Sequence, residues 1–190
     1  MKTFIAAPFG NYIKTSNTIS VTGSWTIEKR NGRIKQIVKT LRYTKKGWIN
    51  KIGLRNPGFD YGINKHKKDE VFSIAGIENF SYDTRQWYIG KISPLTTFDE
   101  LEKYISEFNF KQIHACNTLP IDRGGLSGKE LVPYTSKFIM HIKEYYPHIE
   151  IIAGGGISEK EDIKRYIDLG ADHISLGTVC FNPVKLGRLL

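Results

Sequence analysis

The chain has 190 residues, of which 40% are hydrophobic and 25% charged, as expected for one globular domain covering residues 1–190. No apolar run approaches ~18 residues, and the first ten residues do not resemble a signal peptide, so no membrane segment is expected. Two cysteines are too few for a disulfide framework or for an iron–sulphur cluster ligated by this chain alone, and they indicate a reducing, cytoplasmic setting. The net charge of +9 could indicate a nucleic-acid partner, but the charges are scattered apart from Lys65–Lys68. We therefore expect a solvated basic surface, and we predict no metal site.

Apolar runs and helical periodicities alternate along most of the chain. Strands are predicted at 4–7, 18–26, 71–76, 111–115, 149–153 and 173–176, and helices at 97–108, 129–145 and 158–169. The segment 28–46 is basic and irregular, and the aromatic segment 77–94 carries no motif and is interpreted as a hairpin insertion. Strands that alternate with helices predict an α/β fold with a parallel sheet.

The last two predicted strands each end in glycine. Gly154–Gly156 follow the first of them, and Gly177 with Thr178 follows the second. A strand that runs into a glycine-rich turn and then a helix presents backbone N–H groups at a positive helix end, which suits a phosphate. Two such turns in consecutive βα units predict a phosphate site at the carboxyl ends of parallel strands, although glycines also serve plain turns.

Several segments carry a family resemblance. Three segments resemble the C-terminal part of dihydroorotate dehydrogenases, namely GGLSGKELVP (124–133), IIAGGGI (151–157) and GADHISLGTVCF (170–181). That family consists of FMN-dependent TIM barrels of pyrimidine synthesis. Two segments nearer the N-terminus resemble earlier parts of the same family, namely WINKIGLRNPGFDY (48–61) and VFSIAG (71–76). The resemblance implies a set of cofactor contacts: the flavin phosphate held by Gly155, Gly156, Gly177 and Thr178, with Gly128 close to the flavin and Ser24 at a flavin-contacting position.

The resemblance also implies a substrate pocket and a base. The residues expected at the orotate end are Asn50, Ile52, Gly53 and Leu54, with Asn117 or Thr118 holding the substrate ring. The segment CNTLP resembles a family loop whose cysteine or serine removes the C5 proton of dihydroorotate, which would make Cys116 the base. A thiol with an ordinary pKa of ~8.5 can do this chemistry, but a free cysteine at a strand end also serves as a small core residue.

Some family features are missing. Ile113 stands where the family has an asparagine, and Gly23 where some members have a lysine. Pro120 leads almost directly to Gly124, whereas the family has two βα units between these points. Those units include a lysine near the N1/O2 edge of the flavin. In this chain Arg123 or Lys129 could approach that edge of the flavin instead. The fold is therefore expected to be a TIM-barrel-like α/β fold truncated to roughly six strands. Removing two strands leaves strand edges that must be paired or exposed, which allows a smaller barrel, an open sheet or completion by a second copy of the chain. We expect an open or rearranged barrel, as a homo-oligomer.

Two functions from different classes follow from these patterns. The first is FMN-dependent oxidation of dihydroorotate to orotate, in the manner of the soluble branch of the family. The second is a catalytically inactive relative that keeps a phosphate or FMN site or serves as a binding scaffold. A basic nucleic-acid binder is a third reading, which predicts salt-sensitive binding to DNA of arbitrary sequence.

Overall fold

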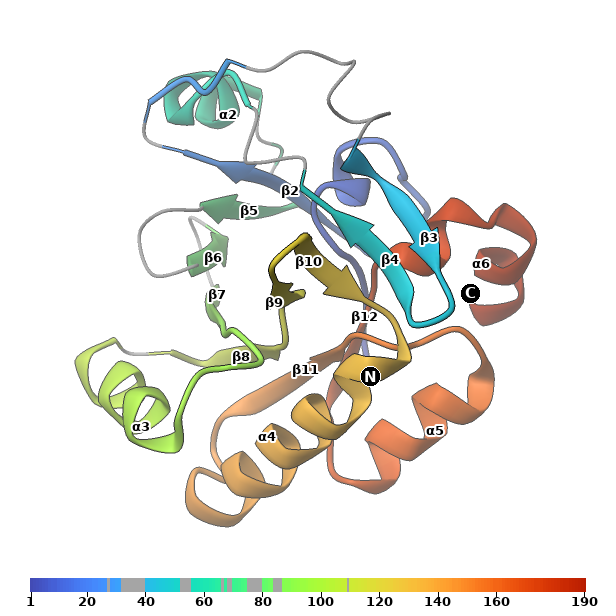
Figure 1. Cartoon of the computed structure of the whole chain (residues 1–190). Coiled ribbons are helices and arrows are strands. Elements are labelled where there is room, and N and C mark those ends of the chain that lie inside the picture. Colours follow the sequence, from blue (N-terminus) through green and yellow to red (C-terminus); the bar gives the residue numbers. More distant parts are fainter. Residues whose placement is uncertain are drawn as a thin grey trace.

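The computed structural model of the chain describes residues 1–26, 28–31, 40–51, 56–65, 67, 70–74, 80–83, 87–108 and 110–190. Eight strands form a closed barrel in the spatial order β1-β12-β11-β8-β7-β6-β5-β2, visible as a ring in Figure 1. These strands are β1 (Thr3–Ile5), β2 (Ile19–Trp25), β5 (Val71–Ile74), β6 (Phe80–Asp83), β7 (Trp87–Lys91), β8 (Gln112–Ala115), β11 (Glu150–Gly154) and β12 (His173–Leu176). The fold is a truncated TIM-barrel-like α/β fold, as the sequence predicts.

All six predicted strands are present, and each pairs in parallel with at least one neighbour. Two further strands complete the ring: β6 runs antiparallel to both β5 and β7, so the interpretation of 77–94 as a hairpin insertion is confirmed for its described residues. All eight strands come from one chain and the ring is closed, so of the expected open or rearranged barrel the structure shows the rearranged form. The hairpin pairs with β5 on one side and with β8 on the other, while β8 and β11, between which the two βα units are missing, pair directly, so the ring has no open edge.

Helices cover the outer face of the barrel. They are α2 (Phe59–Lys65), α3 (Phe98–Glu107), α4 (Val132–Tyr145), α5 (Lys160–Asp168) and α6 (Pro183–Leu189), with short 3₁₀ turns η1 (Phe9–Asn11), η2 (Lys129–Leu131) and η3 (Thr178–Phe181). The start of α3 is a capping box in which the Thr97 hydroxyl accepts from the Glu100 N–H and the Glu100 carboxylate accepts from the Thr97 N–H. In the described part of the chain, no helix is long and apolar enough to cross a membrane.

Alternation along the strands divides the core into two layers. Inside the barrel lies a small cluster with one residue from each of five strands, namely Phe4, Val21, Val71, Ile89 and Ile152. The larger cluster lies between the barrel and the helices and includes Ile113, Ala115, Ile174 and Leu176. Because successive strand residues point to opposite faces, these two sets determine which neighbouring side chains face the barrel interior.

A second, antiparallel sheet lies across the ring in Figure 1. Its spatial order is β3 (Arg42–Thr44), β4 (Gly47–Asn50), β10 (Gly124–Ser127) and β9 (Leu119–Ile121). The sheet follows β8 at its carboxyl end and leads into η2 and α4. The loop after β10 also packs against the turn that follows β11, because a Cβ at Gly156 would lie 3.2 Å from the Gly128 carbonyl oxygen. The sequence did not predict this sheet, which covers the end of the barrel where the candidate site lies.

Candidate functional site

The two glycine turns lie next to each other at one end of the barrel. The strands β11 and β12 are parallel, with Gly154 opposite Ser175, so Gly155 follows one strand as Gly177 follows its neighbour. Among the described residues, a Cβ atom added at Gly177 would have only the Ala6 Cβ within 4 Å, at 4.0 Å. This turn therefore leaves open space of the kind that a phosphate needs, and Thr178 begins η3 directly after it.

The first turn is packed much more tightly on its outer side. Gly155 and Gly156 have φ values of +90° and +75°. Added Cβ atoms would lie 2.8 Å from Leu131 and 2.6 Å from Val132, at the start of α4. The structure thus requires glycine at both positions for packing and for backbone conformation, whether or not a phosphate binds.

The loop before η2 closes over this turn. Gly128 has φ of +129°, and a Cβ there would lie 2.9 Å from the Lys46 carbonyl oxygen of the β3–β4 hairpin. The next residue, Lys129, forms an ion pair with Asp162 of α5. Burial acts to raise the pKa of Asp162, but hydrogen bonds from Lys129, Ser158 and Glu159 outweigh it and hold that pKa below its usual range. The Asp162 carboxylate therefore links the loop that carries Lys129 to the segment that follows the glycine turn, and the Lys129 amine is paired with this carboxylate.

Three of the predicted substrate residues come together on the small sheet. Asn50 pairs with Gly125, and its side-chain Nδ2 donates to the Gly125 carbonyl at 3.4 Å. A Cβ at Gly125 would lie 2.4 Å from the Thr118 hydroxyl. Asn117 precedes Thr118 and accepts from its N–H through the side-chain oxygen at 2.9 Å. Ile52, Gly53 and Leu54 lie outside the described residues, and so does the side chain of Ser24, although its backbone belongs to β2.

Cys116 lies on the helix side of the barrel. It belongs to the larger core cluster, and its Sγ is 3.4 Å from the Thr135 hydroxyl of α4. Because that hydroxyl donates its single hydrogen to the Gly154 carbonyl oxygen at 2.7 Å, the thiol is the donor to Thr135. Burial raises the pKa of Cys116 to about 11, an effect that Thr135 and Lys91 only partly offset. At neutral pH Cys116 is therefore a protonated thiol.

Thiol alkylation provides a direct check. Burial raises the pKa of both Cys116 and Cys180 to about 11, so each has about 100-fold less thiolate below pH 9 than in the unfolded chain. We expect iodoacetamide at pH 8 to leave both residues largely unmodified in the folded protein and to modify both in guanidinium, as measured by mass spectrometry. Rapid alkylation of Cys116 alone in the folded protein would contradict this and would reveal an activated thiolate.

A cation that the sequence analysis missed lies at the same end of the barrel. Lys91 ends β7 opposite His114 of β8, and Ile89, two residues earlier, is in the interior cluster, so Lys91 faces inward. Within the described residues its amine forms no ion pair. Burial lowers the pKa of Lys91, although Cys116 acts to raise it, and burial together with Lys91 holds the pKa of His114 well below its usual range.

Lys91 places a cation at the barrel end, where the sequence lacks the lysine that the family has between Pro120 and Gly124. Arg123 is exposed and Lys129 is paired with Asp162, so neither supplies a free charge to the barrel end. Lys91 supplies such a charge. Ile89, two residues earlier, is apolar, and this spacing was the sequence signal that Lys91 would share its face of the strand. The sequence predicted a hairpin at 77–94 but not the parallel pairing of β7 with β8 that brings Lys91 into the barrel, because no motif in this segment marks a barrel strand.

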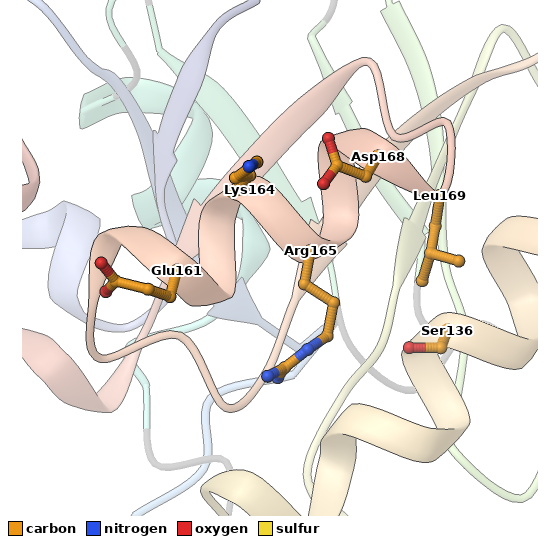
Figure 2. Close-up of a pocket in the computed structure, with 6 residues that line it drawn as sticks. All are labelled: Ser136, Glu161, Lys164, Arg165, Asp168 and Leu169. Atoms are coloured by element: carbon orange, nitrogen blue, oxygen red, sulfur yellow. The ribbon is translucent and has the colours of Figure 1, made fainter.

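One surface groove lies elsewhere. It runs between α4 and α5 on the outer face and is lined by Ser136, Glu161, Lys164, Arg165, Asp168 and Leu169, whose charged side chains of both signs are spread along it in Figure 2. None of the candidate residues lines this groove. We therefore assign the candidate site to the barrel end beneath the small sheet.

Comparisons with known proteins agree with this geometry. The sequence model of a family described as dihydroorotate dehydrogenase matches residues 88–187, which is more than half of the chain. The catalytic subunit of dihydroorotate dehydrogenase B (NAD(+)) from Staphylococcus carnosus is 31% identical over 236 residues, covering 83% of this chain and 77% of that protein. The chain belongs to the dihydroorotate dehydrogenase family.

Other family members match over shorter segments. The quinone-type enzyme from Dichelobacter nodosus is 38% identical over 55 residues, which is 29% of this chain but only 16% of that protein. The corresponding subunit from Thermotoga maritima is 34% identical over 58 residues, covering 30% of this chain and 22% of its own length. The alignment with the Staphylococcus relative is longer than the 190-residue chain itself, so that relative contains segments which this family member lacks.

Solved structures show the same fold. The dihydroorotate dehydrogenase from Eimeria tenella in complex with ferulenol matches with a TM-score of 0.65 at 15% identity, covering all of this chain and 79% of that one. This likeness supports the truncated barrel and, at this identity, the fold alone.

Proposed function

We propose that this family member binds FMN at the barrel end and oxidises dihydroorotate to orotate or performs a closely related flavin oxidoreduction. The observation that carries the proposal is the pair of glycine turns on adjacent parallel strands, with open space at Gly177, in a chain that belongs to the family. In this assignment Gly155, Gly156, Gly177 and Thr178 hold the phosphate. When bound, FMN would supply the acceptor for a hydride.

The remaining roles follow from position. Gly128 and Ser24 are the proposed flavin contacts, and Asn50, Asn117 and Thr118, together with Ile52, Gly53 and Leu54, are the proposed substrate contacts. The amide of Asn50 offers a donor and an acceptor, which suits a ring of alternating C=O and N–H groups. Lys91 supplies positive charge at the barrel end, where an electron acceptor gains negative charge during reduction.

Cys116 remains the proposed base, and the structure gives this role a pH signature. A base must be deprotonated, and burial raises the pKa of Cys116 to about 11. If Cys116 removes the substrate proton, dihydroorotate oxidation should increase continuously from pH 7 to pH 10, because the thiolate fraction grows about tenfold per pH unit below the pKa.

The burial of Cys116 favours a second candidate, a relative that binds FMN without turnover. The thiol lies in the helix-side core and donates to Thr135, so it is not directed into the barrel interior. In this reading the phosphate turns and Lys91 keep the cofactor, and the substrate is not oxidised.

An absorbance spectrum before and after adding dihydroorotate without oxygen separates the candidates. We expect protein reconstituted with FMN to show flavin absorbance that is lost on adding dihydroorotate. The loss should be blocked by Cys116→Ala, which removes the proposed base, and unaffected by Cys180→Ala, which alters the other buried cysteine. A flavin band that dihydroorotate never bleaches would support the inactive relative, and a protein that takes up no FMN would exclude both.

A further inference from the structure

Two buried hydroxyls hold the glycine turn from behind. Thr135 of α4 donates to the Gly154 carbonyl oxygen at 2.7 Å, and the Tyr166 hydroxyl of α5 donates to the Gly155 carbonyl oxygen at 2.7 Å. Both side chains are almost completely buried, with exposed fractions of 0% and 1%. These contacts fix two successive peptide groups at the end of β11.

Fixing these carbonyls also fixes the direction of the N–H groups. In a trans peptide the C=O and the following N–H point in opposite directions. The helices that carry Thr135 and Tyr166 cover the outer face of the barrel, so both carbonyls point outward toward them. The N–H groups of Gly155 and Gly156 therefore point away from the helices, and the neighbouring turn at Gly177 has open space among the described residues.

The turn needs such a restraint because it contains three successive glycines. Glycine has more backbone freedom than any other residue, so an unsupported turn would lose much conformational entropy when it closed on an anion. Beyond the glycines, Asp162 accepts from the N–H groups of Ser158 and Glu159 at 2.8 and 3.1 Å, which anchors the other end. Burial raises the pKa of Tyr166 far above its ordinary value, so its hydroxyl stays a donor at any working pH.

We propose that Thr135 and Tyr166 are positioning residues that aim the N–H groups of Gly155 and Gly156 at the phosphate of FMN. This inference rests on the proposed function, because it deepens the same site. Neither residue is among the proposed flavin contacts, because both are buried behind the glycine turn. Their effect should therefore appear in the part of the affinity that the phosphate contributes.

The test compares FMN with riboflavin, which has the same ring and no phosphate. Removing one buried hydroxyl should weaken FMN binding about five- to tenfold, because such a hydrogen bond contributes about 1 kcal/mol and the turn also gains freedom. We expect Tyr166→Phe and Thr135→Val to raise the Kd for FMN by this factor and to leave the Kd for riboflavin within twofold. Thr135→Ser should restore FMN affinity. Tyr145→Phe, an exposed position at the end of α4, is the matched control and should change neither.

Equal losses for FMN and riboflavin, or no loss for either, would overturn the inference, and so would failure of Thr135→Ser to restore binding. Amide hydrogen exchange at Gly155 and Gly156, measured by NMR on the protein without flavin, provides a readout that needs no cofactor. We expect faster exchange in Tyr166→Phe than in the wild type. If the wild type binds neither FMN nor riboflavin, the proposed function fails. If amide exchange at Gly155 and Gly156 is also the same in Tyr166→Phe as in the wild type, the positioning role fails as well.

Discussion

Lys91→Met should slow the reduction of bound FMN by dihydroorotate about 10²- to 10³-fold and at the same time make the protein more stable. The rate should fall because a preorganised charge at the site of developing negative charge typically accounts for a factor of this size. The free energy of unfolding should increase because burial lowers the pKa of Lys91 below its ordinary value of 10.5, so the charged amine destabilises the folded state. Stopped-flow absorbance and urea unfolding measure the two effects.

The sign of the stability change follows from linkage. Since the folded pKa lies below the unfolded one, Lys91 destabilises the protein most below its folded pKa, and this penalty disappears as pH rises above 10.5. The gain from Lys91→Met should therefore shrink as the pH is raised toward 10.5 and vanish above it. Lys111→Met, at an exposed position before β8, is the control and should alter neither rate nor stability appreciably. A destabilised Lys91→Met with normal flavin reduction would show that Lys91 is a structural residue.

Gly47→Ala should destabilise the protein by about 3 kcal/mol or more and weaken FMN binding in parallel. Gly47 has φ of +132°, and an added Cβ would lie 1.8 Å from the Ser127 carbonyl oxygen and 3.2 Å from the Gly128 Cα. Neither backbone can move without breaking the pairing of β4 with β10, on which Asn50 is held against Gly125. Urea unfolding and an FMN titration of the same variant measure the two losses.

Gly187→Ala is the matched control for this substitution. Gly187 lies in α6, and an added Cβ would meet no atom of the described residues within 4 Å. Alanine is the better helix former, so this variant should be unchanged or about 0.5–1 kcal/mol more stable. If Gly47→Ala and Gly187→Ala had equal stability, the close approach of the β3–β4 hairpin to the Gly128 loop would be excluded.

The local sequence pattern was sufficient to predict the barrel strands that end in glycine turns. Strand β12 has the predicted bounds 173–176, and β11 differs from its prediction by one residue at each end, because apolar runs that end in glycine mark buried parallel strands wherever they occur. The helix predicted at 97–108 is likewise present as α3, whose start is held by the Thr97 and Glu100 box, because capping depends on residues three positions apart. These features need only neighbouring residues, and the sequence supplies them.

The sequence could not predict how the barrel closes or what lies over it. The pairing of β4 with β10 joins residues about 75 positions apart through short strands without clear alternation, so no local pattern reveals it. The hairpin itself is local and was predicted, but its pairing on one side with β5 and on the other, in parallel, with β8, which closes the ring, depends on tertiary structure.

The chain by itself thus determined the glycine turns, the strands that carry them and the family. Only the tertiary structure decided that Lys91 enters the barrel while Lys129 pairs with Asp162, and that Cys116 faces Thr135 rather than the interior. The physical reason is that the face a side chain occupies, and therefore its solvation and its charged neighbours, depends on strand register and on which helix packs behind the strand. Residue type alone fixes neither.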